Sequence, residues 1–179
     1  MALKIEKPAL KFTGNMTMNN DPKYIIIHHA AISRCTIEDI HSWHLAKGWA
    51  GCGYHFFVNK AGRIFEGRPV KANGAHTVGQ NTKSIGICLE GDFTKEKPSK
   101  EQIKALQELV AYLQAEYDID NDHIKGHNDF NATLCPAIDL KELFAPIEEP
   151  EVDLLELVAE IEERLSELKR QIERREKNG

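Results

Sequence analysis

The stretch Tyr24-Ile25-Ile26-Ile27-His28-His29-Ala30 decides the fold of this chain. Its continuous apolar run, rich in β-branched side chains, predicts a central strand that is covered on both faces. Side chains alternate along a strand, so His28 shares a face with Ile26, and His29 lies on the opposite face. Only one of the two histidines can therefore reach a site shared with distant residues, and local chemistry does not choose between them.

A second informative stretch, Gly126-His127-Asn128-Asp129-Phe130-Asn131-Ala132-Thr133-Leu134-Cys135-Pro136, lies far downstream. It adds an imidazole and a thiol at loop edges, and zinc accepts both kinds of ligand in catalytic sites that keep a fourth corner for water. His28, His127 and Cys135 are therefore a candidate metal triplet, with Zn²⁺ as the predicted cofactor. Each residue alone has a plainer interpretation, because a histidine at a strand end is usually only hydrogen-bonded and a lone cysteine is usually buried.

Extended and helical patterns alternate around these stretches. Strands are predicted at 53–59, 64–66 and 84–89, the first two joined as a hairpin and the third half-buried. Helices are predicted at 37–47 behind Thr36, at 103–117 behind a Ser99–Gln102 capping box, and at 139–144. This mixture favours an α/β fold, a central mixed β-sheet flanked by helices.

The character of the sequence predicts three regions. Residues 1–22 are expected to form an irregular N-terminal arm, residues 23–147 a catalytic domain, and residues 148–179 a linker and an amphipathic C-terminal helix. In that last region the apolar residues follow one another at spacings of 4, 3, 4, 3 and 4, as in a short coiled-coil seam: Leu154, Val158, Ile161, Leu165, Leu168 and Ile172.

The flanks of this seam are acidic early (Glu160, Glu162 and Glu163) and basic late (Lys169, Arg170, Arg174 and Arg175). Opposite charges at the two ends favour antiparallel pairing with a second copy, a homodimer, or with another helix of similar charge pattern. The alternative is a terminal helix that folds back on its own domain, and the sequence does not decide between them.

Composition excludes several classes of protein. The 179 residues are 41% hydrophobic and 28% charged, with a formal net charge of −5, so no basic excess indicates a nucleic-acid partner. No run approaches the roughly 20 apolar residues of a membrane-inserted helix. The N-terminal segment Met1–Pro8 lacks the apolar core and cleavage site of a signal peptide, which predicts synthesis as a cytoplasmic protein.

Five motifs in order resemble the N-acetylmuramoyl-L-alanine amidase family, in the branch shared by phage lysozyme-type amidases and animal peptidoglycan recognition proteins. The resemblance covers Tyr24 to Leu143. The motifs are Ile-Ile-Ile-His28-His29-Ala, Gly53-Tyr54-His55-Phe56, Gly74-Ala75-His76, Ser84-Ile85-Gly86-Ile87 and the stretch from Gly126-His127 to Thr133-Leu134-Cys135-Pro136.

The resemblance implies zinc-dependent cleavage of the amide between N-acetylmuramic acid and L-alanine in bacterial peptidoglycan, with His28, His127 and Cys135 as ligands. Tyr54 matches the family's active-site tyrosine, whose hydroxyl can bond the attacking water or the tetrahedral intermediate. Thr133 stands where some members carry lysine and the recognition branch carries threonine, and a hydroxyl is a weaker oxyanion donor than an ammonium.

Three further residues have predicted roles in this site. Glu90 ends a strand and is either the proton carrier of the reaction or an ordinary solvated glutamate. His55 and His76 are expected to line the cleft and to contact the sugar or the peptide of the substrate.

The leading hypothesis is a phage or prophage endolysin, which the resemblance implies is held in the cytoplasm until a holin opens the membrane. One alternative is a noncatalytic muropeptide-binding module, against which the intact His28, Tyr54, His127 and Cys135 argue. A second is a thiol peptidase that uses Cys135 or Cys52; a chelator should inhibit the zinc enzyme, and a thiol alkylator the peptidase.

Overall fold

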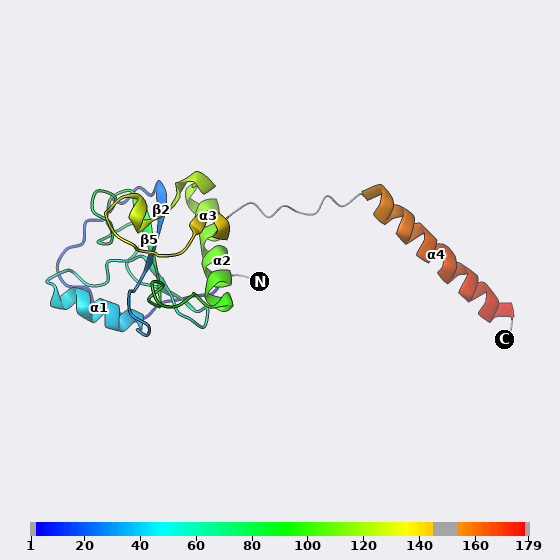
Figure 1. Cartoon of the computed structure of the whole chain (residues 1–179), viewed down its shortest axis with the longest axis horizontal. Helices are drawn as coiled ribbons and strands as arrows, with labels where there is room; N and C mark the ends of the chain where they lie inside the picture. The colour runs from blue at the N-terminus through cyan, green and yellow to red at the C-terminus, as the bar shows by residue number, and fades with distance from the viewer. Residues whose placement is uncertain (1–2, 145–153, 178–179) are drawn as a thin grey trace. The chain divides into compact units, whose positions relative to one another are not determined.

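The structure, a computed structural model, describes residues 3–144 and 154–177. Its centre is a six-stranded sheet in the order β1-β4-β3-β5-β2-β6. The strands are β1 (Ile5–Glu6), β2 (Tyr24–His29), β3 (Phe56–Val58), β4 (Ile64–Glu66), β5 (Ser84–Leu89) and β6 (Ile124–Gly126). β3 and β4 form an antiparallel hairpin and the other neighbours are parallel, so the predicted mixed sheet is confirmed (Figure 1).

The helices are α1 (Ile37–Ala46), α2 (Lys100–Tyr117), α3 (Leu140–Leu143) and α4 (Leu154–Lys177), with 3-10 turns at Asn121–His123 and His127–Asp129. Thr36 caps α1 as predicted, and its side chain accepts the amide N–H of Asp39. The capping box predicted for α2 is only half formed. Ser99 accepts the amide of Gln102, but the Gln102 side chain donates to the carbonyl oxygens of Val58 and Glu90 instead of returning to the helix start.

Two helices cover opposite faces of the sheet, and each closes a separate core (Figure 1). On the α2 side, Leu106 and Leu109 pack with strand residues such as Ile25. On the α1 side, Ile37 packs with Cys88. All six residues of β5 are buried, so the prediction of a half-buried strand is wrong, because both of its faces are covered.

Short strands at the sheet edges lie outside the sequence predictions. β1 falls within the predicted arm, residues 1–22, and pairs with β4, so that arm is not wholly irregular. β6 pairs with β2 and leads directly to His127. The contacts divide the chain into Met1–Phe144 and Ala145–Gly179. The predicted linker at 146–150 lies outside the described residues, and no described helix is both long and apolar enough to cross a membrane.

Candidate metal centre

The three predicted ligands meet at the carboxyl ends of two neighbouring strands. His28 lies near the end of β2, and His127 comes directly after β6, its parallel neighbour. The carboxyl ends of parallel strands lie on the same side of the sheet, so residues that follow neighbouring strands lie close together. Cys135 arrives from the loop that follows His127, whose Asn128 amide donates to the Cys135 carbonyl oxygen at 2.8 Å.

The donor atoms of His28, His127 and Cys135 all lie within 4.8 Å of one another, the one such group in the described part of the chain. The Cys135 Sγ is 3.8 Å from the His28 Nδ1. Tetrahedral zinc with Zn–N near 2.0–2.1 Å and Zn–S near 2.3 Å puts such a pair about 3.6 Å apart. The donor set and its spacing therefore fit zinc.

The structure also decides between the two adjacent histidines. His28 is 1% exposed and lies beside Cys88, its partner in the register of β2 and β5, on the α1 side of the sheet. His29 points to the other side, where its Nδ1 accepts the amide N–H of Phe93 at 3.0 Å. Strand alternation thus leaves only His28 in the cluster.

His76 holds the His28 ring through a hydrogen bond between ring nitrogens. The His28 Nε2 lies 3.0 Å from the His76 Nδ1, the His76 Nε2 lies 3.5 Å from the Ser84 Oγ, and the Ser84 hydroxyl donates to the Gln80 carbonyl oxygen. Because the Ser84 hydroxyl donates to Gln80, its oxygen accepts from the His76 Nε2. The His76 Nδ1 is then unprotonated and accepts from the His28 Nε2, so the His28 Nε2 carries the proton. We infer that its Nδ1 lone pair faces the cluster, because the partner of one ring nitrogen sets the tautomer.

The backbone makes room for the His76 ring. A Cβ at Gly86 would lie 2.6 Å from this ring, and one at Gly74 would lie 2.5 Å from it. The Asn81 side-chain oxygen accepts the amide N–H groups of both His76 and Thr77. The loop is therefore shaped around a histidine held against His28.

The second ligand histidine has a partner that the sequence analysis missed. The His127 Nε2 lies 3.1 Å from the Asn131 Oδ1, which leaves the Nδ1 for the cluster. Thr77 was also not predicted from the sequence as a neighbour of the site, and its hydroxyl is 3.0 Å from the His76 Nδ1. His127 and Asn131 are joined by a single helical turn, which is too short to give a periodic signal, so nothing in the sequence marks Asn131.

Burial sets the charge states around the cluster. It lowers the pKa of His28 and of His76 well below the usual value and also lowers that of His127, so all three are neutral at pH 7. Neutral imidazole is the form that binds a metal. Burial raises the pKa of Cys135 to about 11. The metal-free thiol therefore keeps its proton, whereas a coordinating divalent cation removes it.

Tyr54 packs against the cluster. Its ring centroid is 5.1 Å from that of His28 and 5.7 Å from that of His44, and the His44 Nδ1 accepts the amide N–H of Gly53. Burial, reinforced by neighbouring cysteine thiols that include Cys88, raises the pKa of Tyr54 well above 10. The phenol is therefore a neutral hydrogen-bond donor at physiological pH.

Two predicted catalytic residues have different surroundings. Thr133 is exposed, and its hydroxyl oxygen accepts the amide N–H of Cys135 at 3.2 Å, so its own proton stays available. The Glu90 carboxylate accepts the amides of Cys35 at 3.4 Å and of Lys60 at 2.9 Å. It is not a member of the group whose donor atoms lie within 4.8 Å of one another.

The prediction that His55 contacts the substrate is corrected by its burial. His55 is 0% exposed, and its two ring nitrogens bond the Ala72 carbonyl oxygen and the Gly86 amide. No polar ring atom is left for a ligand, so His55 joins segments of the fold. His76 is buried as well, and its nitrogens are occupied by the contacts described above.

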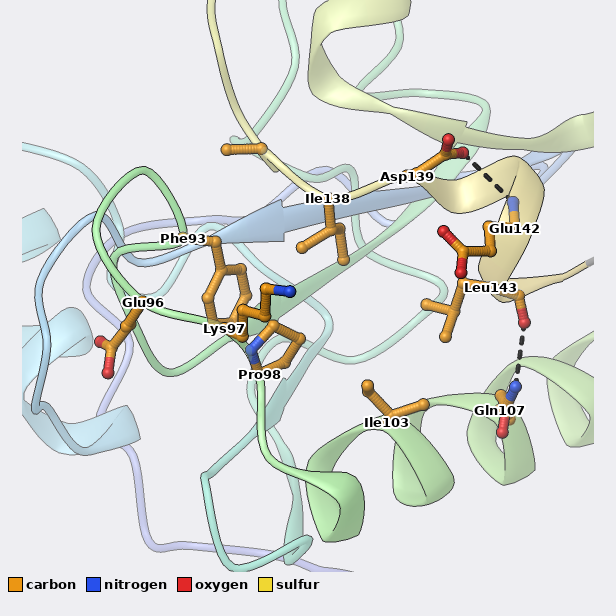
Figure 2. A pocket seen from close by; sticks show the side chains of 11 residues that line it. Phe93, Glu96, Lys97, Pro98, Ile103, Gln107, Ile138, Asp139, Glu142 and Leu143 are labelled. Atoms are coloured by element: carbon orange, nitrogen blue, oxygen red, sulfur yellow. Dashed lines mark hydrogen bonds between the residues drawn. The ribbon is translucent and has the colours of Figure 1, made fainter.

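A pocket of about 530 Å³ lies beside the segment that follows Cys135, and none of the predicted site residues lines it (Figure 2). Phe93, Ile103 and Ile138 point into it. The Gln107 side chain of α2 donates to the Leu143 carbonyl oxygen, and Asp139 caps α3. The bond from Gln107 holds the end of α3 against α2.

Comparison with known proteins gives a consistent result. Residues 18–138 match the model of the family described as N-acetylmuramoyl-L-alanine amidase. The endolysin of Klebsiella phage KP32 is 31% identical over 133 residues, which cover 70% of this chain and 87% of that protein.

Solved structures agree. The N-acetylmuramoyl-L-alanine amidase LysC from Clostridium intestinale URNW matches with a TM-score of 0.75 at 34% identity, covering 78% of this chain and 94% of that one. Peptidoglycan recognition protein-LE, solved with tracheal cytotoxin, a monomeric diaminopimelic acid-type peptidoglycan, matches with a TM-score of 0.64 at 31% identity, covering 70% and 81%. The match to the family model spans both site stretches, and the chain belongs to the N-acetylmuramoyl-L-alanine amidase family.

Proposed function

We propose that this protein is a zinc-dependent amidase that cleaves the bond between N-acetylmuramic acid and L-alanine in peptidoglycan. The observation that carries the proposal is the convergence of His28, His127 and Cys135, with donor atoms within 4.8 Å of one another. Two nitrogens and one sulfur leave a corner of a tetrahedral metal open, as in catalytic zinc sites. The family and its endolysin members support peptidoglycan as the substrate.

The chemistry divides between the metal and the chain. Zinc, when bound, polarises the amide carbonyl and lowers the pKa of water. Tyr54, neutral because of its burial, can donate to the oxygen on which negative charge develops. Thr133, exposed beside the thiolate ligand, can add a second and weaker donor.

We also propose that the protein acts on the bacterial cell wall as an endolysin. As an endolysin, the protein would reach the wall from the cytoplasm after release, and its partner would be the glycan–peptide polymer. The alternative, a noncatalytic peptidoglycan-binding module, is favoured by the recognition proteins among its relatives. The complete ligand set favours hydrolysis instead.

Mass spectrometry of digested cell wall tests the bond that is cut. We expect muramic acid with a free lactyl carboxylate and peptides with new L-alanine amino termini. New reducing sugar ends, or cleavage inside the peptide, would reject this assignment. Binding to the wall with no soluble product would establish the noncatalytic module.

We propose that His76 is a positioning residue that fixes the orientation and tautomer of His28. His76→Phe keeps an aromatic ring, somewhat larger than imidazole, and removes both nitrogens. We expect zinc affinity to fall by roughly 10- to 100-fold, as for other partners of metal ligands. Competition with a chromophoric chelator measures this affinity, and His123→Phe, on a solvent-accessible turn, is the matched control.

The result separates two roles for His76. A positioning role changes zinc affinity while the KM of the zinc-loaded enzyme stays near that of the parent. A substrate-contact role, as first predicted from the sequence, raises KM and leaves zinc affinity unchanged. That second pattern would discard the positioning role.

We propose that Glu90 anchors the loops at Cys35 and Lys60 and is not the group that transfers the proton in the reaction. Glu90→Gln then keeps the rate of wall cleavage within about threefold, whereas loss of a general acid or base costs about 10²–10⁴. Glu90→Ala, which leaves both amides without this acceptor, should lower Tm by roughly 3–8 °C. Turbidity assays and thermal unfolding measure the two effects. A hundredfold slower Glu90→Gln enzyme with an unchanged Tm would restore the proton-carrier role.

A further inference from the structure

Taken by itself, the unit Ala145–Gly179 leaves the described part of the apolar stripe of α4 exposed. Val158, Ile161, Leu165, Leu168 and Ile172 each keep 50–57% of their surface open to solvent. A helix of 24 residues extends about 36 Å, and one with an apolar stripe normally buries it against another element. The stripe is therefore an interaction surface.

The spacing of the stripe defines the geometry of its partner. Intervals of 3, 4, 3 and 4 residues from Val158 to Ile172 keep the stripe on one side of a supercoiled pair, where a and d residues interdigitate. Val158, Leu165 and Ile172 then occupy a positions, and Ile161 and Leu168 occupy d positions. The surface thus fits a second helix of the same spacing.

Charges beside the stripe choose the direction of that helix. Glu162 and Lys169 occupy the e positions, and Arg164 and Gln171 the g positions. In a parallel pair g residues face the next e residues of the partner, so Arg164 would face a second Lys169 on both sides. Like charges placed opposite each other destabilise a coiled coil and set partner orientation.

An antiparallel pair removes this conflict. When Leu165 packs on Leu168 of the other copy and Ile161 on its Ile172, e residues face e residues. Glu162 then faces Lys169 of the other helix, and by symmetry this ion pair forms twice. Arg164 faces the neutral Gln171. In this register the residues from Ile161 to Ile172 form four apolar layers, two ion pairs flank them, and Val158 lies outside these layers.

We propose that α4 joins two copies of this chain through an antiparallel coiled coil centred between Leu165 and Leu168. The association needs no catalytic activity, so its test is independent of the proposed function. If that function also holds, the dimer places two amidase domains on one wall particle and raises the apparent affinity for the polymer. With so few layers the dimer is expected to be weak.

Sedimentation equilibrium of the full chain at increasing concentration tests the association. We expect a mass that rises from one toward two times 20.3 kDa and no further. Leu165→Asp should give the monomer at every concentration, because it puts two charges into the central layers. A parent protein that stays monomeric, or that forms trimers or larger species, overturns the proposal.

Charge reversal tests the direction. Glu162→Lys and Lys169→Glu should each weaken the dimer about tenfold or more, since each replaces two ion pairs with two repulsive pairs. The double variant Glu162→Lys with Lys169→Glu restores the pairs and should regain the parent's dissociation constant. Glu163→Lys is the matched control, because it makes the same charge change at the outward f position.

The outcomes are distinguishable. In a parallel dimer, Lys169→Glu would tighten association, because Arg164 would gain an acidic partner. That result, or equal effects of Glu162→Lys and Glu163→Lys, would reject the antiparallel register. The antiparallel register is supported if both single variants weaken the dimer, the double variant regains the parent's dissociation constant, and Glu163→Lys leaves it unchanged.

Discussion

Cys135→Ser yields a folded protein that retains no zinc and has lost its wall-cleaving activity. A serine hydroxyl is not a thiolate, so the cluster falls from three ligands to two imidazoles. Loss of metal removes several kcal/mol of transition-state stabilisation, and about 4 kcal/mol corresponds to a roughly thousandfold slower reaction. Metal analysis by mass spectrometry after gel filtration and the clearing of a cell-wall suspension measure both effects.

Cys35→Ser is the control for this variant. Cys35 is also a buried thiol, but it lies in the core on the α1 side and outside the group of ligands. The Cys35→Ser protein should retain one zinc and nearly full activity. A Cys135→Ser protein that kept both its zinc and its rate would remove Cys135 from the site. Inhibition of the parent by an alkylator but not by a chelator would favour the thiol peptidase.

Tyr54→Phe gives the second large effect, and it differs in kind. The ring against His28 remains, so zinc content should stay at the parent level, while the hydroxyl donor is lost. Removal of one donor to a developing oxyanion costs about 10²–10³ in kcat. Steady-state cleavage of a defined muropeptide, with KM and kcat measured separately, checks the prediction.

Tyr24→Phe makes the same chemical change at a tyrosine that packs on His123 and Phe130, and it should leave kcat unchanged. If Tyr54→Phe altered KM alone, its hydroxyl would serve only ground-state binding. If it altered nothing, the assignment of Tyr54 to the reaction would be wrong.

The strongest features of the fold could be predicted from the sequence because they carry long or chemically distinct signals. The apolar run of β2 and the cap of α1 at Thr36 are of this kind. β1 and β6, with two and three residues, are too short for any periodicity and depend on pairing with distant strands. For β5 the sequence is misleading, because Gly86 and Cys88 alternate with Ile85, Ile87 and Leu89 and give a period of two, which predicts one covered face although both faces are covered.

The site shows the same division. Motif order predicts His28, His127 and Cys135 as ligands, and the structure brings their donor atoms together, but His76, the partner of His28, comes from a distant loop. His55 and His76 belong to similar motifs, yet one is bonded to backbone groups and the other to His28. Glu90 was placed correctly at a strand end, but its two amide partners come from residues 35 and 60, and no local pattern predicts that meeting.

Zinc K-edge X-ray absorption of the purified protein tests whether His28, His127 and Cys135 bind a metal. We expect one bound zinc with two imidazole nitrogens at about 2.0–2.1 Å, one sulfur at about 2.3 Å and one further light atom. Chelation should remove the signal together with the activity, and added zinc should restore both. Zinc bound without a sulfur neighbour, or full amidase activity in protein stripped of metal, would contradict this assignment.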